Sequence, residues 1–94
     1  MRRCYVNGQQ MADKHSAHSY LQEILALPDD YGKNLDALYD CLTEMGDDTT
    51  ICLTDPEAVR QNLGPYGDRL LATLQDAAAD NPKLHVIFEP ETRE

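Results

Sequence analysis

Two pairs of aspartates share a spacing that suits joint chemistry: Asp36 with Asp40, and Asp76 with Asp80. Residues four apart lie on one side of a helix, so each pair brings two carboxylates together. Paired carboxylates serve as general acid and base where a cleft gives them different pKa values. Displayed on an open surface, they instead attract basic partners. Whether these pairs could serve catalysis or binding therefore depends on how exposed their helix faces are.

The first pair lies on a segment with clear helical periodicity. Its apolar residues recur at helical spacing and predict one buried stripe: Leu35, Leu38, Leu42 and Met45. Its polar residues fall on roughly the opposite side: Asp36, Tyr39, Asp40 and Thr43. An exposed face disfavours the desolvation that acid–base catalysis needs. A first-turn carboxylate suits the helix dipole, which accounts for Asp36 but not for Asp40. Composition and spacing do not distinguish two interpretations of this polar face: a solvated surface without a partner, or a binding surface.

Histidine and cysteine offer little further chemistry. His15 and His18 have a spacing that suits a shared metal ion, but further ligands are missing at informative spacing, so we expect both on the surface or on a helix flank. Cys41 and His85 form a nucleophilic pair only if the fold brings them together. We expect a packed thiol at Cys41 instead, and all three cysteines are expected to be reduced. Neither a metal nor a cofactor is expected.

The chain is strongly acidic, with 17 Asp and Glu against 8 Lys and Arg and a net charge of −9. Such a field repels nucleic acid and anionic membranes and attracts basic proteins over one Debye length, ~8 Å at physiological salt. No signal peptide is visible in MRRCYVNGQQM, and no run of about 18 apolar residues predicts a membrane span. We therefore expect a cytoplasmic protein, monomeric in isolation, with one domain over residues 1–94 and a frayed acidic tail over residues 89–94.

Turn and breaker residues divide the chain into seven elements. Short apolar runs predict strands over residues 4–6, 49–53 and 84–88, and the segments between them have helical periodicity. The resulting order, β-α-α-β-α-α-β, favours parallel pairing with right-handed crossovers. The expected fold class is α/β, with a small three-stranded parallel sheet packed on helices. Residues 28–33 form an irregular link between the first two helices, in which Gly32 is expected to take a positive φ.

The stretch from Leu25 to Leu42, LALPDDYGKNLDALYDCL, resembles the block LALP-x-x-YG-x-NLDALWDCL of the barstar family of ribonuclease inhibitors. The match is specific because the unusual link and the helix agree in register. Weaker similarity covers nearly the whole chain, including VNG near its start. The resemblance implies a barstar-like fold. It also implies an intracellular inhibitor, not an enzyme, that plugs the active site of a small basic barnase-like ribonuclease.

The resemblance further implies which residues bind the nuclease. In that family the second helix and the link before it enter the RNA-binding cleft. Asp40 would occupy the position of a substrate phosphate, and Asp36 would meet further basic groups. Tyr39 stands where the family carries Trp, and Asp76 corresponds to an acidic position that reaches another part of the enzyme. The full set of expected partner-binding residues is Asp30, Gly32, Asn34, Asp36, Tyr39, Asp40, Thr43, Asp76 and Asp80.

Two further positions depart from the family pattern. Asp30 replaces an aromatic residue of the link, and Met45 stands where a second Trp is common. These changes keep the acidic anchors but alter the surface around them. One alternative hypothesis is therefore an acidic immunity or antitoxin module for a partner that is not barnase-like. Another, a small hydrolase that uses Cys41 or the carboxylates, lacks a supporting motif.

Overall fold

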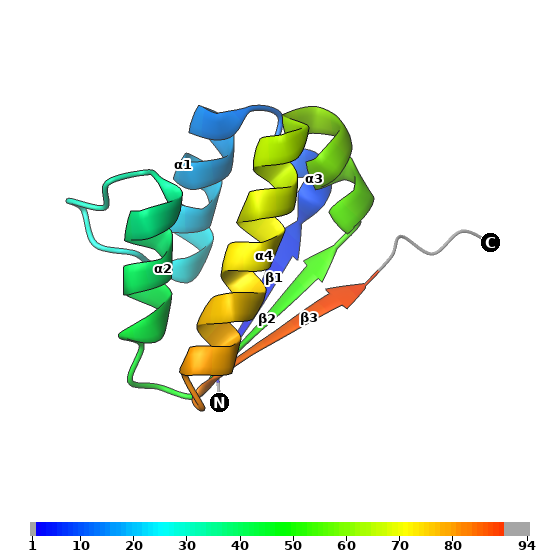
Figure 1. Cartoon of the computed structure of the whole chain (residues 1–94). Coiled ribbons are helices and arrows are strands. Elements are labelled where there is room, and N and C mark those ends of the chain that lie inside the picture. Colours follow the sequence, from blue (N-terminus) through cyan, green and yellow to red (C-terminus); the bar gives the residue numbers. More distant parts are fainter. Residues whose placement is uncertain (1, 90–94) are drawn as a thin grey trace.

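Three parallel strands form the sheet on which the helices pack. The computed structural model describes residues 2–89 (Figure 1). Its elements are β1 (Arg2–Asn7), the short 3-10 helix η1 (Gly8–Gln10), α1 (Lys14–Leu25), α2 (Leu35–Thr43), β2 (Thr49–Thr54), α3 (Pro56–Leu63), α4 (Pro65–Asp80) and β3 (Leu84–Glu89). The strand order is β1-β2-β3, and both neighbouring pairs are parallel. The expected α/β fold and its element order are therefore confirmed.

The core lies between one face of the sheet and the helices. Alternate residues of β1, Cys4 and Val6, are buried, and Ile51 and Leu53 lie beside them in β2 with no exposed surface. Figure 1 shows α1, α2 and α4 on one side of the sheet. Each fully buried aliphatic side chain stabilises the fold by about 1.5–3 kcal/mol. None of the helices within residues 2–89 combines the length and the apolar character needed to cross a membrane.

Two asparagines fix the ends of α2, the helix that carries the first aspartate pair. The Asn34 side chain accepts a hydrogen bond from a first-turn backbone N–H at 2.7 Å and caps the N-terminus. At the other end, the buried Asn81 side chain donates to the carbonyl oxygens of Leu42 (3.0 Å) and Met45 (3.1 Å). The helix ends at Thr43, so the prediction that it reaches Met45 is wrong, although the Met45 side chain still packs against the core with the other members of the stripe.

The segment that connects α1 to α2 is anchored on α1. Leu27 and Tyr31 point inward and are buried. The carbonyl oxygen of Pro28 accepts hydrogen bonds from the Gln22 side chain at 2.8 Å and from the Tyr31 backbone N–H at 3.0 Å. Leu27 and Tyr31 thus anchor the link to the core on both sides of Asp29 and Asp30, which favours one conformation for these exposed residues.

Two local predictions about this chain are wrong. The positive φ expected at Gly32 occurs at Lys33 (φ 54°), directly before the extended N-cap Asn34. A left-handed lysine costs about 1 kcal/mol relative to glycine, which the contacts of the link must offset. The acidic tail was expected to begin at Glu89, but this residue belongs to β3, where its carbonyl accepts a backbone hydrogen bond at 2.8 Å. The rest of that tail, residues 90–94, lies outside the described residues.

Candidate partner-binding site

The structure brings the two aspartate pairs onto neighbouring helices. α2 packs along α4 (Figure 1), and the Tyr39 hydroxyl donates a hydrogen bond across them to the Asp80 carboxylate. Asp36 and Asp40 are exposed on α2, and Asp76 is exposed on α4 one turn before Asp80. We call the surface formed by Asp36, Tyr39, Asp40, Asp76 and Asp80 the acidic face. The sequence spacing indicates each pair, but only the packing of α2 on α4 joins them.

The link adds a further carboxylate beside α2. Asp30 is exposed, and its charge acts on the half-buried Cys41 thiol of α2. Burial raises the pKa of that thiol, and the carboxylates of Glu44, Asp40 and Asp30 raise it further. The charges of Asp30 and Asp40 therefore both act on the Cys41 thiol.

The structure does not support the nucleophilic pair considered for Cys41. A thiol with a raised pKa is a poor nucleophile at neutral pH. His85 is exposed at a β3 position that alternates with those facing the helices, so it lies on the opposite side of the sheet from α2. Within residues 2–89, no group of three or more His, Cys, Asp and Glu side chains is arranged to hold a metal ion.

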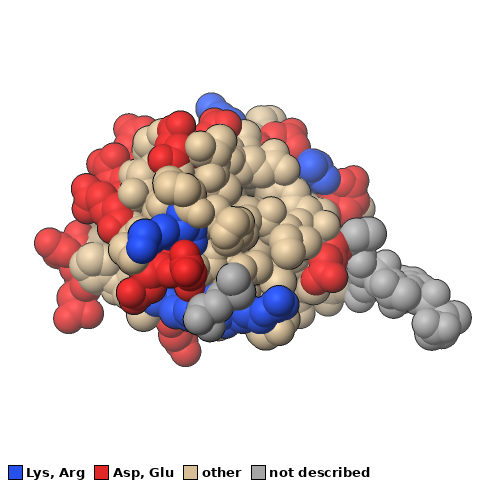
Figure 2. All heavy atoms as spheres, turned by 90° about the horizontal axis from the view of Figure 1, so that it is seen from below, with Lys and Arg blue, Asp and Glu red and all other residues tan. Residues whose placement is uncertain are grey.

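The carboxylates of the acidic face have no ion-pair partner within residues 2–89. Figure 2 views the molecule from below, and acidic side chains are most numerous along its left edge, the side on which α2 and the link lie in Figure 1, with others spread over the rest of the view. The one basic residue of the link, Lys33, is turned to α1, where its ammonium group donates to Ser19 Oγ at 3.4 Å. The negative charge of this side is therefore left for an external cation.

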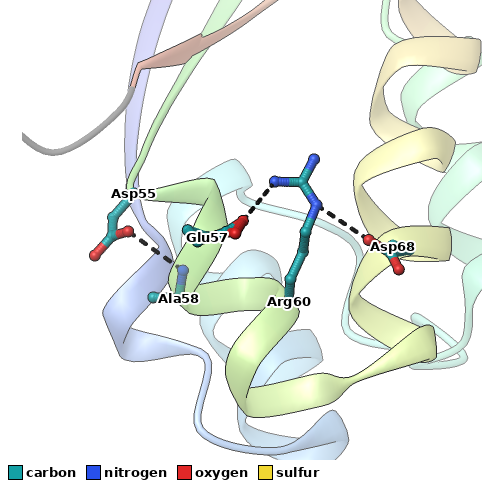
Figure 3. A network of polar contacts seen from close by, with 5 residues as sticks. All are labelled: Asp55, Glu57, Ala58, Arg60 and Asp68. Carbon is teal, nitrogen blue, oxygen red and sulfur yellow. Dashed lines mark hydrogen bonds and ion pairs between the residues drawn. The ribbon is translucent and has the colours of Figure 1, made fainter.

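Other acidic residues, in contrast, have structural partners within the chain (Figure 3). The Asp55 carboxylate caps α3 by accepting a hydrogen bond from the Ala58 backbone N–H at 3.2 Å. The Arg60 guanidinium binds Glu57 at 3.1 Å and Asp68 at 3.0 Å, which ties α3 to α4. These interactions explain the acidic residues around α3 without a partner protein. In the acidic face, only Asp80 has such a partner among the described residues, the hydroxyl of Tyr39.

Three of the expected site residues are uncharged and affect the shape of the surface: Gly32, Asn34 and Thr43. The Asn34 side chain caps α2 and also donates to the carbonyl oxygen of the exposed Gly32 at 3.3 Å. The Thr43 hydroxyl turns back to its own helix, toward the carbonyl oxygens of Tyr39 (2.9 Å) and Asp40 (3.1 Å). Their polar groups are already engaged, so they offer shape and a fixed backbone to a partner.

A buried histidine of α1 forms a hydrogen bond with the link. His18 is 1% exposed, and its Nδ1 and Nε2 lie 2.6 Å from the hydroxyls of Tyr31 in the link and Tyr66 in α4. The prediction that His18 lies on the surface is wrong, whereas His15 is exposed. With both ring nitrogens bonded to tyrosines, His18 is not free to bind a metal. It connects the link to α4 through one chain of hydrogen bonds.

Burial lowers the pKa of His18 below its ordinary 6.5, and the charge of Lys33 acts in the same direction. The folded protein therefore keeps this imidazole neutral, while the unfolded chain binds a proton near pH 6.5. The stability that depends on neutral His18 is complete above that pH and is lost as the pH falls toward the folded pKa. We expect the free energy of unfolding in urea to be smaller at about pH 5.5 than at about pH 7.5.

Nuclear magnetic resonance of the imidazole provides the site-specific check on this expectation. The His18 ring signals should titrate with a midpoint below 6.5. A midpoint at or above that value would contradict the proposed cause. Replacing His18 with glutamine should also reduce the difference in stability between the two pH values.

Comparison with known proteins identifies a family and a similar bacterial protein. The family described as barstar (barnase inhibitor) matches residues 1–89, which include the link, α2 and α4. A Bacillus subtilis (strain 168) protein named "Putative ribonuclease inhibitor YrdF" is 38% identical over 91 residues, which cover 95% of this chain and 100% of that protein. The matched region thus contains every residue of the acidic face.

Proposed function

Because the chain belongs to the barstar family, we propose that it inhibits a barnase-like ribonuclease by covering the enzyme's active site with the acidic face and the link. The family is one of inhibitors rather than enzymes. The observation that carries the proposal is the set of carboxylates on α2 and α4 that have no cationic partner within residues 2–89. A ribonuclease active site is rich in cations because it binds the phosphates of RNA.

Asp40 is assigned the central role in this proposal. A carboxylate that takes the place of a substrate phosphate uses cations that the enzyme has already positioned, through charge-assisted hydrogen bonds. Asp40 is exposed on a helix whose two ends are held by Asn34 and Asn81. Its backbone is therefore ordered before binding, which reduces the entropy lost on association.

The neighbouring residues extend this contact. Asp36 adds an exposed carboxylate on α2, and Asp76 adds one on α4. The hydrogen bond to Asp80 orients Tyr39, so that its half-buried ring is available for contact at the centre of the acidic face. Aromatic side chains held in this way are frequent anchors of interfaces.

The link contributes the remaining contacts of the proposed interface. Asp30 and Gly32 are exposed, while Tyr31 is buried between them and bonded to His18. A side chain anchored in the core fixes the exposed residues on each side of it. The inhibitor is assigned to the cytoplasm of the cell that makes the nuclease, where a monomer would bind one nuclease molecule and protect cellular RNA.

Equimolar addition of the protein is expected to abolish RNA hydrolysis by barnase. The net charge of −9 should accelerate encounter with a basic enzyme. The association rate constant, measured by stopped-flow fluorescence, should fall by about tenfold or more between about 0.05 M and about 0.5 M salt. An association rate that does not respond to salt would contradict electrostatic steering.

The alternative partner is a nuclease or other toxin that is not barnase-like. The observation that favours it is Asp30, which places an additional exposed carboxylate in the link. Inhibition assays with barnase separate the two possibilities. Absence of inhibition, together with binding of another basic protein through Asp40, would favour the alternative.

A further inference from the structure

A cavity of about 300 Å³ opens beside the acidic face. It lies between the end of α1, the start of the link, the end of α2 and the first residues of β1 and β2. Leu27, Pro28, Cys41 and Met45 provide much of its apolar lining. This volume is at the small end of the range for ligand sites, which suits a single side chain better than a nucleotide.

The acidic and basic side chains that line the cavity differ in whether they have a partner within the described residues. Two carboxylates, Glu44 and Asp47, line it, and neither forms an ion pair within residues 2–89. Among the described residues that line the cavity, the one cation is Arg2, whose guanidinium donates a hydrogen bond to the carbonyl oxygen of Leu25 at the end of α1. At the opposite wall the Cys41 thiol has a raised pKa, to which nearby carboxylates contribute. The α2 side of the cavity therefore favours a positive charge.

We propose that this cavity receives one long basic side chain, an arginine or a lysine, from the ribonuclease. The inference rests on the proposed function, and it adds a second anchor to the contact at Asp40. The apolar walls suit the methylene stem of such a side chain, and Glu44 and Asp47 suit its cationic end. Cys41 lines the cavity and directly follows Asp40 in α2, so one partner can reach both places.

A small probe tests the cavity without a nuclease. The full-length protein is titrated with n-butylguanidinium and with neutral n-pentanamide, while backbone amide signals are followed by nuclear magnetic resonance. Saturable shifts centred on Cys41, Met45 and Gly46 are expected for the guanidinium compound alone. Shifts that do not saturate, that centre elsewhere or that are equal for the two compounds would overturn the proposal.

Two variants sharpen this test. Gly46 lines the cavity, and a Cβ added there meets no atom within 4 Å, so the fold should accept Gly46→Leu. The leucine side chain is expected to obstruct the cavity. This variant should abolish the guanidinium shifts, and Glu44→Gln should weaken that binding by about threefold or more. The matched control is Glu23→Gln, which removes an exposed carboxylate of α1 that does not line the cavity. Shifts that persist in Gly46→Leu would exclude the cavity as their origin.

The same variants report on the nuclease complex. Gly46→Leu and Glu44→Gln should each weaken barnase binding by about tenfold, and Glu23→Gln by less than about twofold. Unchanged affinity in both cavity variants would overturn the assignment to the interface. Failure of the wild-type protein to inhibit barnase would instead contradict the proposed function, and the guanidinium titration would still decide whether the cavity accepts a basic side chain.

Discussion

Replacing Asp40 with alanine is expected to weaken binding to barnase by a factor of about 30 to several thousand. This range corresponds to about 2–5 kcal/mol, the usual effect of removing one partner from a desolvated charge pair. The effect should be large because the nuclease cations would remain buried opposite a methyl group. Isothermal titration calorimetry or dissociation kinetics would measure it. Because Asp40 is exposed and caps no helix, the midpoint of thermal unfolding should change little.

Two further variants control for general effects of charge. Glu23→Ala removes one exposed carboxylate from α1, outside the acidic face, and should change affinity only slightly. Asp36→Ala removes a carboxylate of the acidic face one turn from Asp40, and its effect should lie between the two. An Asp40→Ala variant that inhibits barnase as well as the wild-type protein would contradict the phosphate-mimic assignment.

Replacing His18 with alanine is expected to lower the free energy of unfolding by about 3–5 kcal/mol. The substitution leaves a space in the core and removes the partner of the Tyr31 and Tyr66 hydroxyls. Loss of a large buried ring and loss of hydrogen bonds to buried groups each destabilise proteins by about 1 to several kcal/mol. Urea unfolding at neutral pH would measure the change.

The His18→Ala variant should also bind barnase less tightly, because Tyr31 would no longer fix the link. His15→Ala is the matched control, since His15 is an exposed histidine on the same helix. It should change neither stability nor affinity by more than a few tenths of a kcal/mol, as is usual at exposed sites. Equal stability of the two variants would contradict the structural role assigned to His18.

The fold was predictable because its signals are local. The apolar runs of β2 and β3 and the helical stripe with Leu38 and Leu42 each specify an element within a few residues. Helices between the strands then favour a parallel sheet, which the structure has. The family resemblance identified the helix and link that form the candidate site, and the exposed positions of Asp36 and Asp40 agree with the helical spacing.

The features that no local pattern predicted depend on contacts between distant residues. The Asn81 side chain, which follows α4, donates to the carbonyl oxygens of Leu42 in α2 and Met45 just after it. Likewise, only the packing of α2 on α4 brings Tyr39 to Asp80, 41 positions away. Neither contact is encoded in the spacing of one helix.

His18 is a case in which a local signal existed. It precedes Leu21 and Leu25 by three and seven positions, so it shares their buried stripe on α1. Its two tyrosine partners, however, lie 13 and 48 positions away and are not evident from that pattern. The positive φ was assigned to Gly32 because glycine accepts it most easily. The link instead places Lys33 there, since the entry into α2 determines the backbone at that point.

Competition between this protein and a 3′-mononucleotide for barnase tests the central claim most directly. The nucleotide occupies a phosphate position of the nuclease active site. If the acidic face fills that position, the apparent Kd of the inhibitor should rise in proportion to the nucleotide concentration once the nuclease is saturated with nucleotide. An apparent Kd that stays constant at saturating nucleotide, with inhibitor and nucleotide bound together, would contradict the claim that Asp40 replaces a substrate phosphate.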